Sequence, residues 1–130
     1  MEITIRNPKG AEAPAAYSHA IEAKGEGRTL YIAGQVGLRP DGTPGEGLEE
    51  QANLLFTQLE TILADAGMTF ANVVKTTVFM TNPEDYPAFG KLRSAYLKDV
   101  KPASTLVYVS GLVRPELVLE VEAIAVGPAE

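Results

Sequence analysis

Two glutamates near the C-terminus, Glu120 and Glu122, are the residues whose type and spacing most directly suggest chemistry. A carboxylate can orient a water molecule or transfer a proton, and two together can act as an acid and base pair. They lie two positions apart in a β-favouring run, Leu117–Val126, so they face the same side of a strand. Paired strand glutamates more often belong to a solvated face, but their apolar neighbours Val118 and Ile124 weaken that interpretation.

A second polar group stands at the start of another strand, immediately after Pro102. Alternation along this strand puts one set of side chains on one side and the other set on the opposite side. The first set is Ser104, Leu106, Tyr108 and Ser110, and the second is Thr105, Val107 and Val109. The mostly polar first side is either a solvated face or the wall of a pocket.

Other catalytic arrangements find little support. The chain has no cysteine, which excludes thiol catalysis and thiolate metal sites, and its single histidine cannot build a multi-histidine metal site. We therefore expect no metal. His19 follows Ser18, but no nucleophile motif accompanies them, so a packed or surface histidine is favoured. Tyr17, at the entrance to the second expected strand, is more often a packing residue than a ligand contact.

Length and charge narrow the class of protein. The 130 residues predict one domain spanning 1–130. A net charge of −6, without clustered lysines or arginines, argues against binding to nucleic acid or to anionic membranes. The N-terminus has no apolar signal core, and no stretch approaches the roughly 18 apolar residues of a membrane span. We expect a cytoplasmic protein that binds neither nucleic acid nor membrane.

Periodicity predicts eight elements. The expected strands are Glu2–Arg6, Tyr17–Ala23, Thr29–Ala33, Val73–Met80, the strand after Pro102, and Leu117–Val126; the expected helices are Leu48–Ala66, ended by Gly67, and one from Asn82-Pro83-Glu84 through Leu97. The turn Gly25-Glu26-Gly27 indicates a hairpin between the second and third strands, and Gly34–Gly47 is expected to be a loop.

The order β-β-β-α-β-α-β-β predicts a two-layer α+β domain in which two helices cover one face of a mixed sheet. On the last strand, the all-apolar side that contains Leu119 and Val121 is expected to meet the helices. The opposite side, which carries Glu120 and Glu122, remains half apolar. An open sheet face of this kind suggests association with other copies.

Several stretches, in the same order along nearly the whole chain, resemble one family. They are AYSHAI, LYIAGQVG followed by PDG, VVKTTVFM and LEVEAIAV, and they are similar to the YjgF/RidA family of enamine/imine deaminases. The resemblance implies a chorismate-mutase-like fold and a homotrimer that binds small molecules in clefts between subunits. It implies hydrolysis of reactive 2-imino or 2-enamino acids to 2-keto acids and ammonia, without a cofactor.

Site residues follow from the resemblance one position at a time. Tyr17 matches a tyrosine that shapes the family's pocket, Gly34 and Gln35 match its GQ motif, and Glu120 matches a glutamate thought to position the attacking water. Ser104 stands where the family has a carboxylate-binding arginine.

The pocket thus departs from the family's pattern. Leu106 stands where a cysteine is frequent and Ala33 where a serine is common. A serine hydroxyl offers one neutral hydrogen bond, whereas a guanidinium binds a carboxylate through two charged ones. Arg114, beyond the strand, is a candidate replacement cation.

Two functions remain open at this point. One is a deaminase-type hydrolase of enamines or imines that are neutral or less acidic than the family's usual substrates. The other is a non-catalytic trimeric small-molecule-binding protein. The loss of the arginine favours the second, and the retention of Glu120 favours the first. RNA cleavage, which is attached by name to some relatives, fits the acidic charge least well.

Overall fold

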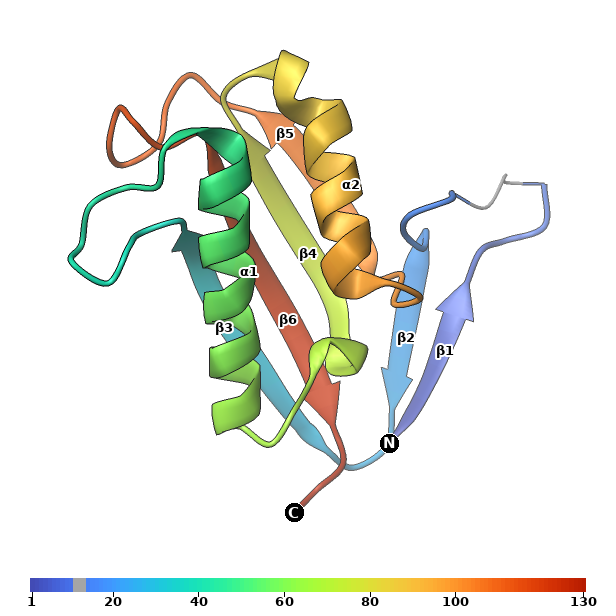
Figure 1. Ribbon diagram of the computed structural model, residues 1–130. Coiled ribbons are helices and arrows are strands. Elements are labelled where there is room, and N and C mark those ends of the chain that lie inside the picture. The colour runs from blue at the N-terminus through green and yellow to red at the C-terminus, as the bar shows by residue number, and fades with distance from the viewer. Residues whose placement is uncertain (11–13) are drawn as a thin grey trace.

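The computed structural model describes residues 1–10 and 14–130. Its elements are β1 (Glu2–Arg6), β2 (Ala20–Lys24), β3 (Arg28–Val36), α1 (Gly47–Asp65), η1 (Phe70–Asn72), β4 (Val73–Met80), η2 (Pro83–Asp85), α2 (Tyr86–Leu97), β5 (Ala103–Tyr108) and β6 (Leu119–Gly127). Both α-helices lie on one side of a mixed sheet, and the expected α+β fold is confirmed (Figure 1).

The main sheet has four strands in the order β3-β6-β4-β5. β6 pairs antiparallel with both β3 and β4, whereas β4 and β5 run parallel. Parallel neighbours need a crossover connection, and α2 supplies it. The strands β3 and β5 therefore form the two edges of this sheet.

The hairpin expected between the second and third strands is wrong. β2 pairs with β1 in a separate two-stranded sheet, and β3 pairs with β6. Gly25 has a φ of +98°, which glycine adopts without strain, and the turn leads the chain from one sheet into the other. Leu30 and Ile32 give β3 an apolar side that packs into the core, which favours pairing with the equally apolar β6.

Several element boundaries also differ from expectation. Residues 34–36, expected in a loop, extend β3, and the second strand begins at Ala20 instead of Tyr17. The last strand begins at Leu119. The second helix opens as the short 3-10 turn η2, in which the Asn82 side chain accepts a hydrogen bond from the Glu84 N–H.

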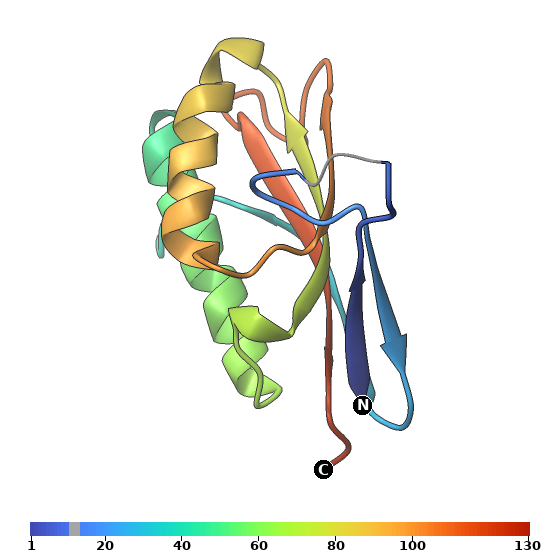
Figure 2. The same cartoon turned by 90° about the vertical axis from the view of Figure 1, so that its right-hand side faces the viewer.

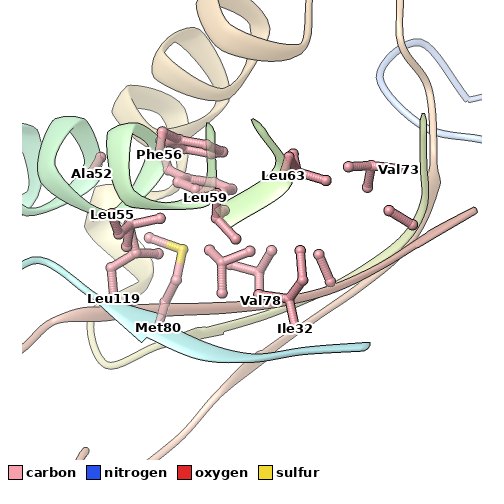
Figure 3. Packing of buried hydrophobic residues seen from close by; sticks show 14 of the residues in the cluster. Ile32, Ala52, Leu55, Phe56, Leu59, Leu63, Val73, Val78, Met80 and Leu119 are labelled. Atoms are coloured by element: carbon pink, nitrogen blue, oxygen red, sulfur yellow. The ribbon is translucent and has the colours of Figure 1, made fainter. Parts of the chain in front are cut away.

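The core lies between the helices and the sheet (Figure 3). Leu55 and Leu63 of α1 are fully buried and belong to one core cluster with Val78 and Leu119. Gln51, also fully buried, donates to the carbonyls of Gly45 and Glu116 and accepts from the Val118 N–H. These three bonds tie α1 to the loop that precedes it and to the segment that precedes β6.

The opposite side of the sheet carries the β1–β2 hairpin at one end only (Figure 2). There Ile3, Ile5 and Ile21 line a hollow with Val126 at the end of β6. The remainder of this side is uncovered in the single chain. Among the described residues, no helix is long and apolar enough to cross a membrane.

Candidate functional site

The uncovered side of the four-stranded sheet, which we call the open face, presents side chains from all four strands. The registers assign to it Tyr31, Val36, Lys75, Thr77, Phe79, Thr105, Val107, Glu120, Glu122 and Ile124. Tyr31 is 77% exposed and Val107 39% exposed, so apolar surface flanks the two glutamates. Lys75 Nζ donates to Thr105 Oγ1 at 2.7 Å and brings a cation to the same side.

Glu120 lies near the start of β6, on the open face between β3 and β4. It pairs with Val36 on one side and with Phe79 on the other. The register of β3 shifts between Ile32 and Gln35, so a bulge at Ala33 and Gly34 interrupts the ladder beside it. Bulges of this kind re-aim side chains next to functional sites.

Gly34 lies directly beneath the Glu120 carboxylate. A Cβ added at Gly34 would overlap Glu120 Oε2 and contact its Cδ and Cγ. Only glycine leaves room for the carboxylate in this position, because any side chain at 34 would displace it. The GQ motif and the glutamate, far apart in sequence, thus form one structural unit.

Ser104 and Leu106 lie on the other side of the sheet. Ser104 pairs with Thr76, which also pairs with the buried Ala123 of β6. The Thr76 hydroxyl donates to Ser104 Oγ at 3.0 Å, and Leu106 packs against the core. Ser104 and Leu106 therefore face the helices and, within one chain, are separated from Glu120 by the sheet.

Tyr17 lies at the same end of β5 as Ser104. The neighbouring Ser18 is buried, its N–H donates to the Pro102 carbonyl at 3.1 Å, and its hydroxyl donates to the Lys101 carbonyl at 2.6 Å. The Tyr17 ring contacts the His19 ring edge to face, with 6.5 Å between centroids. The segment before β2 is thus fastened to the start of β5.

Ala33 and Gln35 accompany Gly34 at the other edge of the sheet. Gln35 Nε2 donates to the Ala33 carbonyl at 2.9 Å. A groove of about 600 Å³ runs here between β3 and α1, and it is lined by Gly34, Gln35 and Leu54 among others. The predicted site residues therefore form two groups, one of Ala33, Gly34 and Glu120 at β3 and β6, and one of Tyr17, Ser104 and Leu106 at β5.

Arg114 does not replace the missing arginine within its own chain. Its Nη1 donates to the Gly42 carbonyl at 3.0 Å, and its Nε lies 3.8 Å from Glu116. It follows the C-terminal end of β5, whereas Ser104 stands near that strand's beginning.

Arg93 of α2 is a cation that the sequence pattern did not single out. Phe89, Arg93 and Leu97 form the buried stripe of the helix, at a spacing of four residues. This spacing is visible in the sequence, but an arginine within an apolar helical stripe is ordinarily assumed to point to solvent. Here it is 8% exposed.

Among the described residues, no three acidic or histidine side chains gather as a metal-binding group. The open-face carboxylates of Glu120 and Glu122 are groups that can orient water or a polar ligand.

Comparison with known proteins shows similarity along nearly the whole chain. Residues 8–127 match the family model described as Endoribonuclease L-PSP. A mouse protein named 2-iminobutanoate/2-iminopropanoate deaminase is 41% identical over 124 residues, covering 90% of this chain and 88% of that protein. A RutC family protein from Aquifex aeolicus is 34% identical, covering 92% and 97%.

Solved structures agree with these sequence matches. A conserved Rid-family protein from Yersinia pestis superposes with a TM-score of 0.84 at 33% identity, covering 96% of this chain and 98% of that one. RidA from a Psychrobacter species gives a TM-score of 0.72 at 32% identity, covering 94% and 97%.

Proposed function

Because this chain belongs to the YjgF/RidA family, we propose that it hydrolyses small, reactive enamines or imines to carbonyl compounds and ammonia. In the balanced reaction an imine C=N bond takes up one water. The water oxygen becomes the carbonyl oxygen, its two protons go to the nitrogen, and ammonia leaves. An enamine first becomes an imine by moving a proton from nitrogen to carbon. Mouse and rat relatives are named 2-iminobutanoate/2-iminopropanoate deaminase, which supports this proposal.

The observation that carries the proposal is the placement of the Glu120 carboxylate over Gly34 on the open face. Glu120 orients the attacking water and accepts its proton. The carboxylate is partly exposed and lies beside a bulge, so water can reach it. Ala33 and Gly34 form the adjacent wall.

The substrate pocket is composite in this proposal. Ser104 and Leu106 lie on β5, on the opposite side of the sheet from Glu120, and Tyr17 lies beside the start of that strand. They can share a pocket with Glu120 only if β5 of one copy approaches β3 and β6 of another. A homotrimer with its clefts between subunits meets this requirement, and the apolar open face supplies surface for the association.

Specificity is expected to differ from that of the named deaminases. Ser104 presents a neutral hydroxyl already engaged with Thr76, so a carboxylate near this position gains at most one neutral hydrogen bond. Substrates are therefore neutral, less acidic, or carry their anionic group elsewhere in the pocket.

The test uses 2-iminobutanoate and 2-iminopropanoate generated in situ, with ammonia release as the readout. We expect weak wild-type activity that Glu120→Gln abolishes. Ser104→Arg is expected to raise the activity about ten- to a hundredfold by adding charge-assisted bonds, if necessary together with Leu106→Cys.

Two outcomes would count against the proposal. Turnover that is unchanged in Glu120→Gln would remove the assigned role of that carboxylate. If neither the wild type nor Ser104→Arg released ammonia, the chain would instead be a small-molecule-binding protein that has kept the pocket and lost the chemistry.

A further inference from the structure

Arg93 is a buried cation that no carboxylate of the described residues pairs with. Its side chain lies on the inner side of α2 and is 8% exposed. Its guanidinium carbon stands 5.3 Å from the centroid of the Phe89 ring, one helical turn earlier. Its Nε is buried and makes no hydrogen bond, and within residues 1–10 and 14–130 no carboxylate forms an ion pair with it.

This arrangement is costly unless an anion completes it. A guanidinium stays protonated at all relevant pH values, so burial cannot neutralise it. The Phe89 ring face compensates only in part for the lost hydration. The chain contains 17 acidic residues, yet none of those described is placed against Arg93. An unoccupied donor of this kind suits an anion that binds and leaves.

The position of Arg93 links it to the helix-facing side of β5. Only residues 98–102 join the C-terminal end of α2 to the start of β5. The helix therefore runs antiparallel to β5, on the helix side of the sheet (Figures 1 and 2). Leu97 ends α2 next to this connection, and Arg93 lies one turn earlier in the helix. On the strand, Ser104 and Leu106 are half-buried and Tyr108 is 46% exposed, so this edge is incompletely covered.

We propose that Arg93 binds the carboxylate of the pocket's ligand, approaching it from the helix layer. The inference rests on the proposed function in one respect, since it takes the helix-facing side of β5 as part of the ligand pocket. It specifies that function further, because it makes the ligand a small organic acid whose carboxylate points toward α2. The neutral Ser104 is then no obstacle to anion binding.

The experiment compares two ligands of one shape. The probe is 2-oxobutanoate, and its neutral counterpart is 2-oxobutanamide. Calorimetry with the wild-type protein is expected to show binding of the acid about ten- to a hundredfold tighter than that of the amide. Arg93→Met, which keeps the length of the side chain and removes the charge, is expected to erase this preference. Lys91→Met, at an exposed position of the same helix, serves as the matched control and keeps it.

A second readout reports on the contact itself. The Arg93 Nε–H resonance, identified by its absence in Arg93→Met, is expected to shift when 2-oxobutanoate is added to the wild type and to stay unmoved with the amide. Arg93→Met is also expected to unfold at the same temperature as the wild type or higher without ligand, because it removes an unpaired buried charge.

Three results would overturn the inference: equal affinity for acid and amide in the wild type, an acid preference that survives in Arg93→Met, or an Arg93→Met protein with a changed oligomeric mass. The last would assign the guanidinium to a carboxylate of a second copy. Ammonia release by a wild type that shows no acid preference would leave the proposed function standing and remove only the role of Arg93.

Discussion

Gly34 leaves the space that the Glu120 carboxylate occupies, so this glycine affects the position of the group proposed to orient water. A methyl group at position 34 would occupy the space of the Glu120 carboxylate, which is the mobile end of a flexible side chain. We therefore expect Gly34→Ala to turn the carboxylate away while leaving the backbone in place. Ammonia release should fall about a hundredfold, as for the loss of a general base, with little change in melting temperature.

Gly90→Ala is the matched control for this substitution. Gly90 lies within α2, and a Cβ there meets nothing within 4 Å. This variant should keep full activity and gain about 0.5–1 kcal/mol of unfolding free energy, since alanine is the better helix former. A fully active Gly34→Ala would show that the position of the Glu120 carboxylate is irrelevant to turnover.

The start of α1 is held to the preceding loop by one ion pair. Arg39 donates from Nε and Nη2 to the two Glu50 oxygens at 2.7 and 2.8 Å, and the Glu46 N–H donates to Glu50 as well. The side-chain bond from Arg39 is the main cause that lowers the pKa of Glu50 from 4.5 to about 2. The loop between β3 and α1, which flanks Gly34 and Gln35, is anchored here.

This depressed pKa predicts a pH dependence of stability. The folded form holds the Glu50 proton more weakly than the unfolded form. The stabilisation of the folded state by ionised Glu50 is therefore complete above about pH 4.5 and is lost as pH falls toward 2. Melting temperatures measured between pH 7 and pH 2 should decline more for the wild type than for Glu50→Gln. Glu49→Gln, at an exposed position of the same turn, should follow the wild type. Parallel curves for the wild type and Glu50→Gln would contradict the assignment.

Local patterns predict most elements of this fold but not their partners. The stripe in α1 and the β-branched run of β4 appear where periodicity indicates them, because each buries its own apolar side. The pairing of β2 with β1 instead of β3 depends on competition between distant strands, which no local turn signal encodes.

The same limit applies to the candidate site. Alternation correctly groups Ser104 with Leu106, yet their side of the sheet follows only from the parallel register with β4. The Glu120 contact with Gly34 depends on the bulge in β3, and the burial of Arg93 on the packing of α2. Neither the register nor the bulge could be derived from spacing along the chain, and the apolar spacing around Arg93 did not by itself imply that an arginine would be buried.

Across the whole molecule, the charge balance still argues against the nucleic-acid chemistry in the name of the matched family model. The net charge is −6, and Arg39, Arg6 and Arg28 are each engaged with a carboxylate. Neutralising several phosphates at once requires clustered cations, which this chain does not supply. The absence of RNA binding stays a prediction.

We predict that copies of this chain associate through the apolar open face. Phe79 and Val107 lie side by side on it, and Tyr31 of β3 is largely exposed, whereas water-facing strands ordinarily carry a more polar surface. Light scattering coupled to size exclusion should give three times the 13.8 kDa chain mass. Phe79→Glu should yield monomers, whereas Thr57→Glu, on the exposed side of α1, should not. A wild-type protein that is monomeric at micromolar concentration would contradict the predicted trimer.

A pocket built from two copies can be tested more directly than trimerisation, because two inactive variants should complement each other in a mixed trimer. Glu120 and Tyr17 belong to the two separate groups of site residues, so in the proposed trimer each cleft takes one of them from each neighbouring copy. Glu120→Gln and Tyr17→Ala are each expected to release little ammonia.

If the two variants are unfolded together and refolded as a mixture, random assembly should leave roughly a quarter of the clefts with both native residues. The mixture should then recover a corresponding fraction of wild-type activity, while either variant refolded alone should recover none. A mixture no more active than its components, yet trimeric by mass, would mean that Tyr17 and Glu120 do not meet across an interface.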